Sequence, residues 1–365
     1  MAKHKFRPKT KKELKKLCQD ESIYLGDIDT SKITDMSHLF YFSDRRDFSG
    51  IETWDTSHVT NMAHMFHDAD FFNGDISYWD VSNVKDMTSM FLLASSFNQP
   101  IGNWDMSHVE STAGMFGSAY SFNQDISSWN VSNVKDMSYM FYGAHSFNKP
   151  INNWDVSNVT NMEGMFAYTK KFNQSLNDWN VSKVENMIDM FKEAKRFNND
   201  IGNWDVSNVK SMSWMFYGAK SFNQPIGKWD VSRVEDIGGM FSYAIKFNQD
   251  ISKWDVSSVQ DMCRTFRGAY AFNGSIENWN TSSVKNMSMM FDDAKSFNRD
   301  ISKWNVSCVE KMVDMFYRAK SFKQTLPKEW AEKARYKNPI EEKNKVKVNL
   351  KRKFIKKKQS NDMEI

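Results

Sequence analysis

The sequence predicts an α/β repeat solenoid, a single curved array of right-handed coils with short parallel strands and short helical turns. Two observations predict it. A tryptophan recurs every 25 residues, eleven times, from Trp54 to Trp304. Nine apolar positions recur with it, and nine apolar side chains cannot bury one another within one 25-residue unit. Stacked copies of the unit can bury them, so we expect a continuous core in which each coil contacts mainly its neighbours.

The chain begins with a basic segment, residues 1–23, that is predicted to close the first coil. Thr10 and Glu13 have the spacing of a capping box, and Leu14 and Leu17 follow on one side. We therefore expect a short amphipathic helix over about residues 10–20. The solenoid itself is predicted for residues 24–330, with about twelve repeats. Its first unit, residues 24–40, is degenerate, with Ile28 in place of the tryptophan.

Within a unit, with the tryptophan as position 1, the apolar spacing changes from two to about three and a half. Positions 1 and 3 alternate, which indicates a short strand, whereas positions 6, 9, 12, 13 and 16 have the spacing of one or two helical turns. The Val-x-Asp-Met stretch at positions 6–9 could instead form a second strand. Val at position 6 and Phe at positions 13 and 19 occur in all eleven units. These positions are therefore predicted to form the core.

Three polar positions repeat as regularly as the core. Position 2 is Asp or Asn, position 4 is always Ser, and position 20 is Asn in ten of the eleven units. We expect these side chains to accept hydrogen bonds from backbone N–H groups of turns or caps. A calcium-binding ladder of acidic side chains is the alternative. The repeat lacks the Gly-rich pattern of calcium-binding coils, which favours the architectural role.

The carboxyl-terminal part of the chain differs in composition from the array. Phe322, Leu326 and Trp330 are predicted to form a last half unit. Residues 331–365 carry twelve Lys or Arg and five acids, which predicts a disordered basic tail. Residues 341–365 could bind nucleic acid or an anionic membrane surface, so tail binding is an alternative function.

No motif of catalysis or cofactor binding stands out from the repeat. The sequence has no phosphate-binding glycine loop and no nucleophile elbow. His64 and His67 with Asp68 could begin a metal site, but no further ligand has a clear spacing. Most of the 24 methionines fall at positions 9 and 12, which makes them core residues. We therefore expect a protein that is not an enzyme and that uses no cofactor or metal.

The sequence features that report on location are few. No stretch is apolar for long enough to span a bilayer, and the basic N-terminal residues contain no apolar run of a signal peptide. The chain has three cysteines, an odd number, which favours free thiols. These features predict a cytoplasmic protein, and we expect a monomer.

Aromatic residues at variable positions are the candidates for binding a partner. Tyr and Trp dominate the energetics of protein interfaces, although isolated surface aromatics need no functional explanation. Four of them occupy positions 11 and 14 of two units three apart, and two more lie beside these. The predicted partner-binding residues are Tyr139, Tyr142, Tyr168, Trp214, Tyr217 and Tyr243.

The unit W-[DN]-V-S-N-V-x-[DN]-M-x-x-M-F-x-x-A-x-x-F-N resembles the 25-residue repeat of BspA-like leucine-rich-repeat bacterial surface proteins. The resemblance covers about residues 24–330. It implies a leucine-rich-repeat-like solenoid, a role in adhesion or protein binding, and a place at the cell surface. It implies no catalytic residues. The unidentified protein partner is therefore expected to bind the array.

Overall fold

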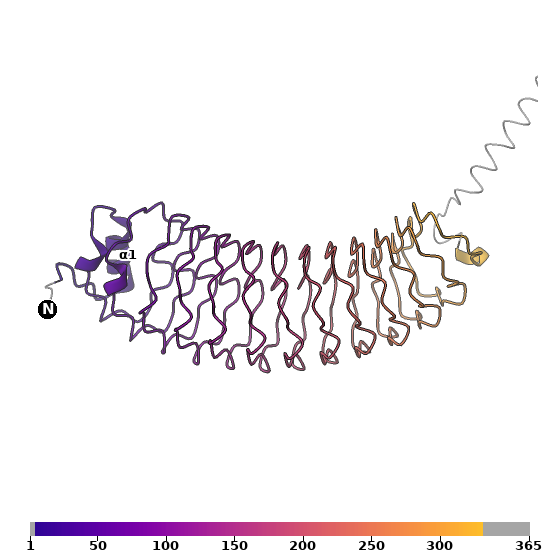
Figure 1. Ribbon diagram of the computed structural model, residues 1–365, viewed down its shortest axis with the longest axis horizontal. Coiled ribbons are helices and arrows are strands. Elements are labelled where there is room, and N and C mark those ends of the chain that lie inside the picture. Colours follow the sequence, from indigo (N-terminus) through magenta and orange to yellow (C-terminus); the bar gives the residue numbers. More distant parts are fainter. Residues whose placement is uncertain (1–3, 331–365) are drawn as a thin grey trace, which may run out of the picture.

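The computed structural model describes residues 4–330, which form one curved solenoid (Figure 1). Three helices lie near the N-terminal end: α1 (Lys11–Gln19) and the 3-10 helices η1 (Leu25–Asp27) and η2 (Ile51–Thr53). Residues 328–330, at the other end, are also helical. The predicted tail, residues 331–365, lies outside the described residues. The tandem repeats therefore form a repeat solenoid, as the 25-residue period predicts.

Neighbouring coils are joined by backbone hydrogen bonds along positions 7–15. Residues at position 8 form isolated parallel bridges from coil to coil, such as Asp136 with Asn161. The N–H groups at positions 9, 11, 13 and 15 donate to carbonyl groups of the next coil; Phe141 donates to Met165 at 2.9 Å. The N–H groups at positions 12, 14 and 16 donate three residues back within the coil. Along positions 9–16, backbone N–H groups that bond to the next coil thus alternate with N–H groups that bond within their own coil.

This pattern corrects two of the elements predicted within the repeat. Positions 9–16 do not form a helix, because an α-helix uses its N–H and C=O groups internally and leaves none to join the coils. Instead, in every unit from Trp54 on, positions 11 and 15 have φ between 53° and 65°, which ends any right-handed helix. Positions 1–3 lie between two turns and outside the row of bridges. The bridges lie instead in the Val-x-Asp-Met stretch that the sequence left open as a strand.

The core is built from three columns of aromatic rings that run the length of the solenoid. Successive tryptophans stack as predicted: Trp129 and Trp154 have nearly parallel rings with centroids 6.2 Å apart. Within each coil the rings at positions 13 and 19 also stack, with centroids 3.9 Å apart for Phe116 and Phe122. Each buried indole N–H donates to a backbone carbonyl 28 residues earlier in the chain, or 29 for Trp54, at 2.9–3.2 Å. The largest side chain of the repeat is therefore buried with its polar atom satisfied.

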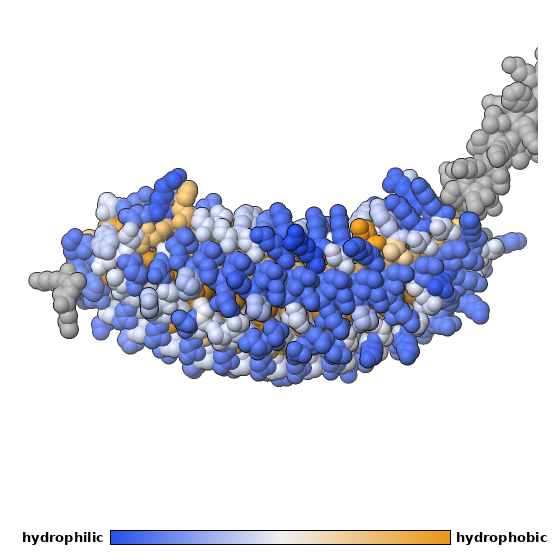
Figure 2. Space-filling model, in the orientation of Figure 1, coloured by the Kyte–Doolittle hydropathy of each residue, from blue (hydrophilic) through white to orange (hydrophobic). Residues whose placement is uncertain are grey.

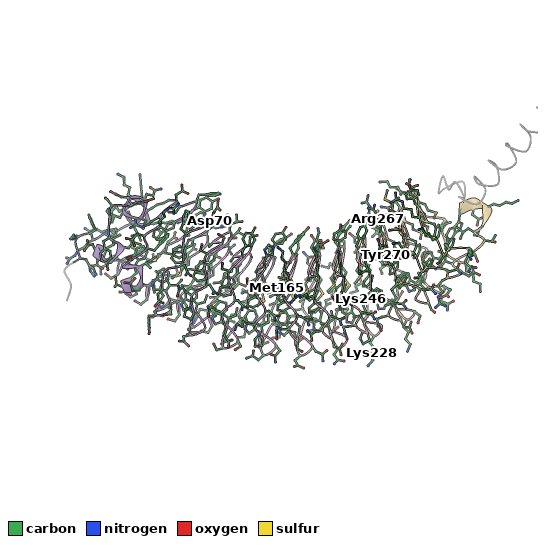
Figure 3. All side chains as sticks on the ribbon, turned by 45° about the horizontal axis from the view of Figure 1, so that its top comes forward. Asp70, Met165, Lys228, Lys246, Arg267 and Tyr270 are labelled. Atoms are coloured by element: carbon green, nitrogen blue, oxygen red, sulfur yellow. The ribbon has the colours of Figure 1, made fainter. Side chains whose placement is uncertain are left out.

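The spacing of these columns accounts for the curvature. Phe141, Phe166 and Phe191, at position 13, are 5.6–5.7 Å apart. The stacked tryptophans are 6.2–6.5 Å apart. Lys228, the residue before Trp229, lies at the convex edge in Figure 3. The backbone hydrogen bonds between coils, which we call the backbone ladder, hold the coils close together on one side. The indole rings keep the coils further apart on the other side. The array therefore curves, with the backbone ladder on its concave side.

Two of the three regular polar positions, 2 and 20, accept backbone hydrogen bonds as expected. Asp or Asn at position 2 accepts the backbone N–H of the Ser two residues later at 3.0–3.2 Å. Asn at position 20 accepts the backbone N–H of position 20 in the next coil at 2.8–3.0 Å. The Ser at position 4 donates in these bonds rather than accepting, which corrects that part of the prediction.

The first coil is closed by α1. Thr10 accepts the N–H of Glu13 at 3.2 Å, and the Glu13 carboxylate accepts the N–H of Lys9 at 2.7 Å, so the capping-box residues act at the helix start. Leu14 and Cys18 of α1 are buried against the array. Arg45, also buried, donates to the carbonyls of Cys18 and Asp20. At the other end Trp330 is buried.

Truncating a core phenylalanine in the middle of the array tests the shared core. Phe191 is fully buried and stacks on Phe166, Phe197 and Phe216. We expect Phe191→Ala to lower the free energy of unfolding by about 3–5 kcal/mol, as buried Phe truncations do. Urea unfolding measures it, with the exposed Lys253→Ala as control, expected within about 0.5 kcal/mol of wild type. Equal midpoints for the two variants would contradict the shared core.

Acid should weaken the array through the turns at position 2. Hydrogen bonds from the following Ser hold the pKa of Asp55, Asp105, Asp155 and Asp230 below the ordinary value. A lowered folded pKa stabilises the fold above about pH 4, the unfolded value, and this stabilisation is lost as the pH falls through the folded pKa. Asp189, Asp236 and Asp292, whose pKa is raised by burial, act in the opposite direction.

Asn occupies position 2 in four units, so Asp→Asn at the four sites is compatible with the turn. We expect D55N/D105N/D155N/D230N to unfold at a lower urea concentration than wild type at pH 7, and at nearly the same concentration near pH 2. The measurement is the urea midpoint as a function of pH. A difference between the two proteins that does not change with pH would refute the linkage.

Candidate functional site

The concave face is formed by positions 10, 11, 14 and 15 of successive coils. Arg267, at position 14, is labelled on this edge in Figure 3, opposite the convex-edge Lys228. The surface seen in Figure 2 is largely hydrophilic, with apolar patches towards the two ends of its upper edge. The core positions are the same in every coil, so what distinguishes one stretch of the concave face from another is the side chains at these four positions.

The six aromatic residues predicted to bind a partner all lie on this face and form two clusters. Tyr142 lies against Tyr139 and Tyr168, with ring centroids 5.9 and 5.2 Å apart. Tyr217 lies in the same way against Trp214 and Tyr243, at 5.4 and 5.8 Å. In all four contacts the rings meet at a steep angle, between 61° and 89°. We call these six residues the aromatic strip.

The coil between the two clusters connects them through residues that the sequence reasoning missed. The Lys192 ammonium lies 6.0 Å from the ring centroids of both Trp214 and Tyr217, within cation–π range. It also donates to Asp189 at 2.9 Å. Beyond the second cluster, the Arg267 guanidinium lies over the Tyr243 ring. One feature of the sequence could have identified Asp189 and Lys192. They occupy positions 11 and 14, the positions of the predicted aromatic residues, in a unit that lies between the two clusters.

The left-handed backbone at positions 11 and 15 sets where the rings lie. Tyr139, Trp214 and Tyr243 each cover the residue at the same position of the next coil, which is a glycine. A Cβ on Gly164 would lie 2.6 Å from the Tyr139 ring, and one on Gly239 would lie 2.3 Å from the Trp214 ring. The third pair is Tyr243 and Gly268. Glycine thus provides both the positive φ and the space for the ring.

Charges within the strip are paired and partly buried. The side chains of Lys192 and Asp189 are each about three-quarters buried. Burial raises the pKa of Asp189, although the Lys192 ammonium opposes that shift. The pKa of Tyr139 is raised by burial and by the hydrogen bond that its hydroxyl donates to Glu163. These groups therefore hold the strip in one arrangement rather than providing a free acid and base.

Several buried polar atoms of this face have no hydrogen-bond partner within residues 4–330. Five such side-chain atoms occur in the described chain, and four of them are at positions 11 and 14: Asp189 Oδ1, Ser242 Oγ, Arg264 Nε and Asp292 Oδ1. The other Asp292 oxygen accepts from Arg267 at 2.9 Å. Because buried polar groups are normally satisfied, this concentration distinguishes the concave face from the rest of the molecule.

A hollow of about 520 Å³ lies at the N-terminal end of the strip. Its lining includes small residues such as Ala113, Gly114 and Ser138 together with Tyr139 and Tyr142. The hollow adds a recess beside the first aromatic cluster in which a side chain of a partner fits.

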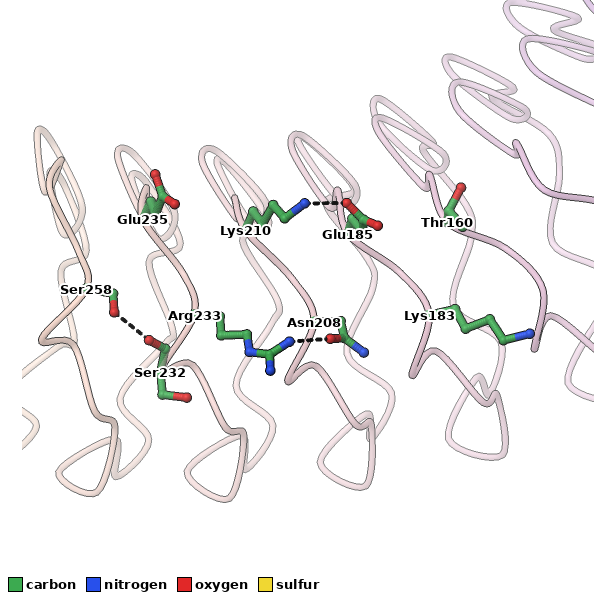
Figure 4. Close-up of a pocket in the computed structure, with 9 residues that line it drawn as sticks. All are labelled: Thr160, Lys183, Glu185, Asn208, Lys210, Ser232, Arg233, Glu235 and Ser258. Atoms are coloured by element: carbon green, nitrogen blue, oxygen red, sulfur yellow. Dashed lines mark hydrogen bonds and ion pairs between the residues drawn. The ribbon is translucent and has the colours of Figure 1, made fainter.

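A larger hollow, about 640 Å³, lies on a flank of the coils rather than on the strip (Figure 4). It is lined by residues at positions 4, 5 and 7 of five successive coils. Lys210 donates to Glu185 at 2.6 Å and Arg233 donates to Asn208 at 2.8 Å. These basic side chains each bond to a side chain of the preceding coil, so the hollow is lined by polar groups that already have partners.

The metal hypothesis receives no supporting geometry in the described residues. His64 and His67 have their Nδ1 atoms 3.3 Å apart, but residues 4–330 contain no group of three or more His, Cys, Asp or Glu side chains arranged to hold a metal ion. Each Asp at position 2 uses one carboxylate oxygen in its own turn. Across residues 4–330 the helices are too short and too polar to cross a membrane.

The chain matches the model of a family described as Mycoplasma protein of unknown function, DUF285. The match recurs over residues 11–120, 34–154, 94–200, 146–254 and 244–352, so the chain belongs to this family. No curated protein matches the chain. Among solved structures, a chain of the Drosophila Toll–Spatzle complex is similar at 12% identity, with a TM-score of 0.24. The similarity covers 67% of this chain and 32%, about a third, of that one.

Two glycine variants test whether the rings lie where the left-handed positions put them. Gly114 and Gly239 share position 11 and nearly the same φ, but a Cβ on Gly114 would meet only Ser89 Oγ, at 3.0 Å. We expect both Gly→Ala variants to lose about 1–2 kcal/mol of stability from the left-handed backbone. Gly239→Ala should lose about 1–3 kcal/mol more, because its methyl group overlaps the Trp214 ring. Equal losses in urea unfolding would show that the ring is not held against Gly239.

Proposed function

We propose that this member of the DUF285 family is a non-catalytic scaffold that binds a protein partner along the aromatic strip. The observation that carries the proposal is the convergence of six Tyr and Trp side chains, all at variable positions, into two clusters. Lys192, in the coil between them, contacts the second cluster and lines the hollow beside the first. Exposed Tyr and Trp in a fixed arrangement are what protein-binding hot spots consist of.

The backbone ladder beneath the strip supports a binding role. Each coil is bonded to the next at positions 9, 11, 13 and 15, so the side chains project from a rigid support. Tyr139, Tyr142 and Tyr168 remain 36–38% exposed. Such side chains lose little conformational freedom when a partner covers them, and preorganisation of this kind increases affinity.

The strip's charged groups support binding rather than chemistry. Asp189 is paired with Lys192, and Asp292 with Arg267, so each acid is engaged by a neighbouring base. The resemblance of the repeat to BspA-like surface proteins supports a role in adhesion, in which the partner is a protein of a host or of another cell. We place the chain at the cell surface as part of the same proposal.

Removing two aromatic side chains of the strip tests the proposal. Position 11 is Gly and position 14 is Gly or Ala in other units, so W214G/Y217A is compatible with the fold. We expect it to weaken partner binding by at least about 2 kcal/mol, the usual hot-spot threshold. The matched control is Tyr78→Asn, which removes an 88% exposed aromatic from position 25, where other units have Asn.

The measurement is capture of proteins from host-cell surface extracts by immobilised full-length protein, the two variants, and a form lacking residues 341–365, at two salt concentrations. Capture should survive the truncation, the higher salt and Tyr78→Asn, and should be lost with W214G/Y217A. If the truncation abolishes capture, the tail carries the function instead. If W214G/Y217A captures the same proteins normally, the strip is not the site.

A further inference from the structure

We infer that the segment bound by the aromatic strip is an extended, acidic polypeptide; this rests on the proposed function and specifies its partner. The inference comes from a second surface beside the strip, which we call the basic row. It consists of all Lys and Arg residues at positions 17 and 18 from the unit of Trp154 onwards. They are Lys170, Lys171, Lys195, Arg196, Lys220, Lys246, Lys295 and Lys320.

The basic row is exposed and carries little compensating charge. Its eight cations are all exposed, and positions 17 and 18 of the same seven units contain no Asp or Glu. Lys195 pairs with Glu193 at 3.2 Å, and the Lys295 ammonium lies 3.5 Å from the Tyr270 ring centroid. The other six form no ion pair within residues 4–330. An anionic partner would find these cations available.

The row lies directly beside the concave face and follows the strip. In Figure 3, Arg267 lies at the concave edge, with Tyr270 and Lys246, from positions 17 and 18, next below it. Three units carry both features, those of Tyr168, Trp214 and Tyr243, and the unit of Lys192 between them carries two further cations, so six cations from Lys170 to Lys246 run beside the strip. In the three units before them, positions 17 and 18 are Ser, Tyr or His. Because the core is the same in all these units, packing does not account for the coincidence, whereas one partner contacting both surfaces does.

An extended peptide fits the dimensions of the strip. Tyr139 and Tyr243 are four coil steps apart, and each step is 5.6–5.7 Å at position 13, about 23 Å in total. Extended chain advances about 3.3 Å per residue, so about seven residues span the strip. Alternate side chains of such a segment point in opposite directions, so apolar ones can enter the aromatic clusters while acidic ones reach the basic row.

The unpaired polar atoms favour a polypeptide over single-stranded nucleic acid. Within the units of the strip, Asp189 Oδ1 needs a donor, and Ser242 Oγ can donate or accept. A peptide main chain offers both, in N–H and C=O groups, while a phosphate backbone offers only acceptors. The rings also meet edge to face, at 61° for Tyr142 with Tyr168 and 89° for Tyr217 with Tyr243. Successive bases require parallel ring faces, which this arrangement does not provide.

The net charge of the array also favours a short acidic peptide over a long polyanion. Residues 21–330 carry a net charge of −9, the total of +4 less +6 for residues 1–20 and +7 for residues 331–365. A long polyanion would be repelled by most of this surface. A short acidic segment would interact mainly with the charges close to it, those of the strip and of the basic row, because charges beyond about 8 Å are largely screened at physiological salt.

The test pans a random 12-residue peptide library on the immobilised full-length protein and measures the affinity of the enriched peptides. The variant is K171S/R196S/K246S, since position 18 is Ser at Ser146, Ser221 and Ser296. The control is K228N/K253N/K303N at position 25 of the convex edge, where other units have Asn and which loses the same charge. A 20-nucleotide oligothymidylate is titrated in parallel.

We expect the enriched peptides to be acidic and to bind K171S/R196S/K246S at least about tenfold more weakly, with the control within about twofold of wild type. Their affinity should fall as the salt concentration rises from about 0.01 M to about 0.15 M. Neutral or basic peptides that lose binding only with W214G/Y217A would overturn the inference and leave the proposed function standing. Peptides indifferent to both variants, or no enrichment, would count against both. Oligothymidylate binding tighter than the best peptide, and weakened by the triple variant, would assign the surface to nucleic acid.

Discussion

The structure depends on one constraint, the hydrogen bonding of alternate backbone amides between adjacent coils. N–H groups at odd positions from 9 to 15 bond the next coil, and those at 12, 14 and 16 close turns within their own coil. Both sets can be satisfied only if each coil has the same number of residues and the same turns as its neighbour. The 25-residue period of the sequence is the consequence, because an insertion would shift every donor away from its acceptor. The aromatic columns then follow, since identical coils place identical side chains above one another.

The same constraint separates the residues that hold the array from those that vary. Positions 1, 13 and 19 are buried between coils, and positions 2 and 20 are bonded to turn and ladder N–H groups, so neither group can vary freely. The turns at positions 10–15 need their backbone groups and bury the side chains at positions 12 and 13, but they leave the side chains at positions 10, 11, 14 and 15 outside the apolar core. The array therefore presents a regular grid of sites whose chemistry can change from coil to coil at little cost to the core. The aromatic strip and the basic row occupy part of that grid.

The features that follow from the 25-residue period were predicted correctly from the sequence, whereas the local structure at positions 9–16, which depends on backbone conformation, was not. The tryptophan period predicted the solenoid and the stacked core. The spacing at positions 9–16 resembled a helix because type II-like turns placed in series also bury every third or fourth side chain. Glycine at position 11 or 15 of six units, such as Gly114 and Gly143, was the signal against a helix.

The six aromatic residues were found because they interrupt a repeat. Asp189 and Lys192 were missed because single charged residues on a surface carry no such signal, and only the contacts reveal that they join the two clusters.

The residues of the strip at positions 11 and 15 have the left-handed backbone that these positions have in every coil from Trp54 on. Tyr139, Tyr168, Trp214 and Tyr243 have φ between 55° and 60°, a region that costs a residue with a Cβ about 1–2 kcal/mol. Glycine at the same positions in other coils avoids this cost, and the ladder holds the conformation either way. Strain of this kind persists where the surrounding structure enforces it. Residues other than glycine have the same φ at most of these positions, so the strain follows from the hydrogen bonding between coils. The case for the concave face as the binding surface therefore rests on the clustering of the aromatic rings.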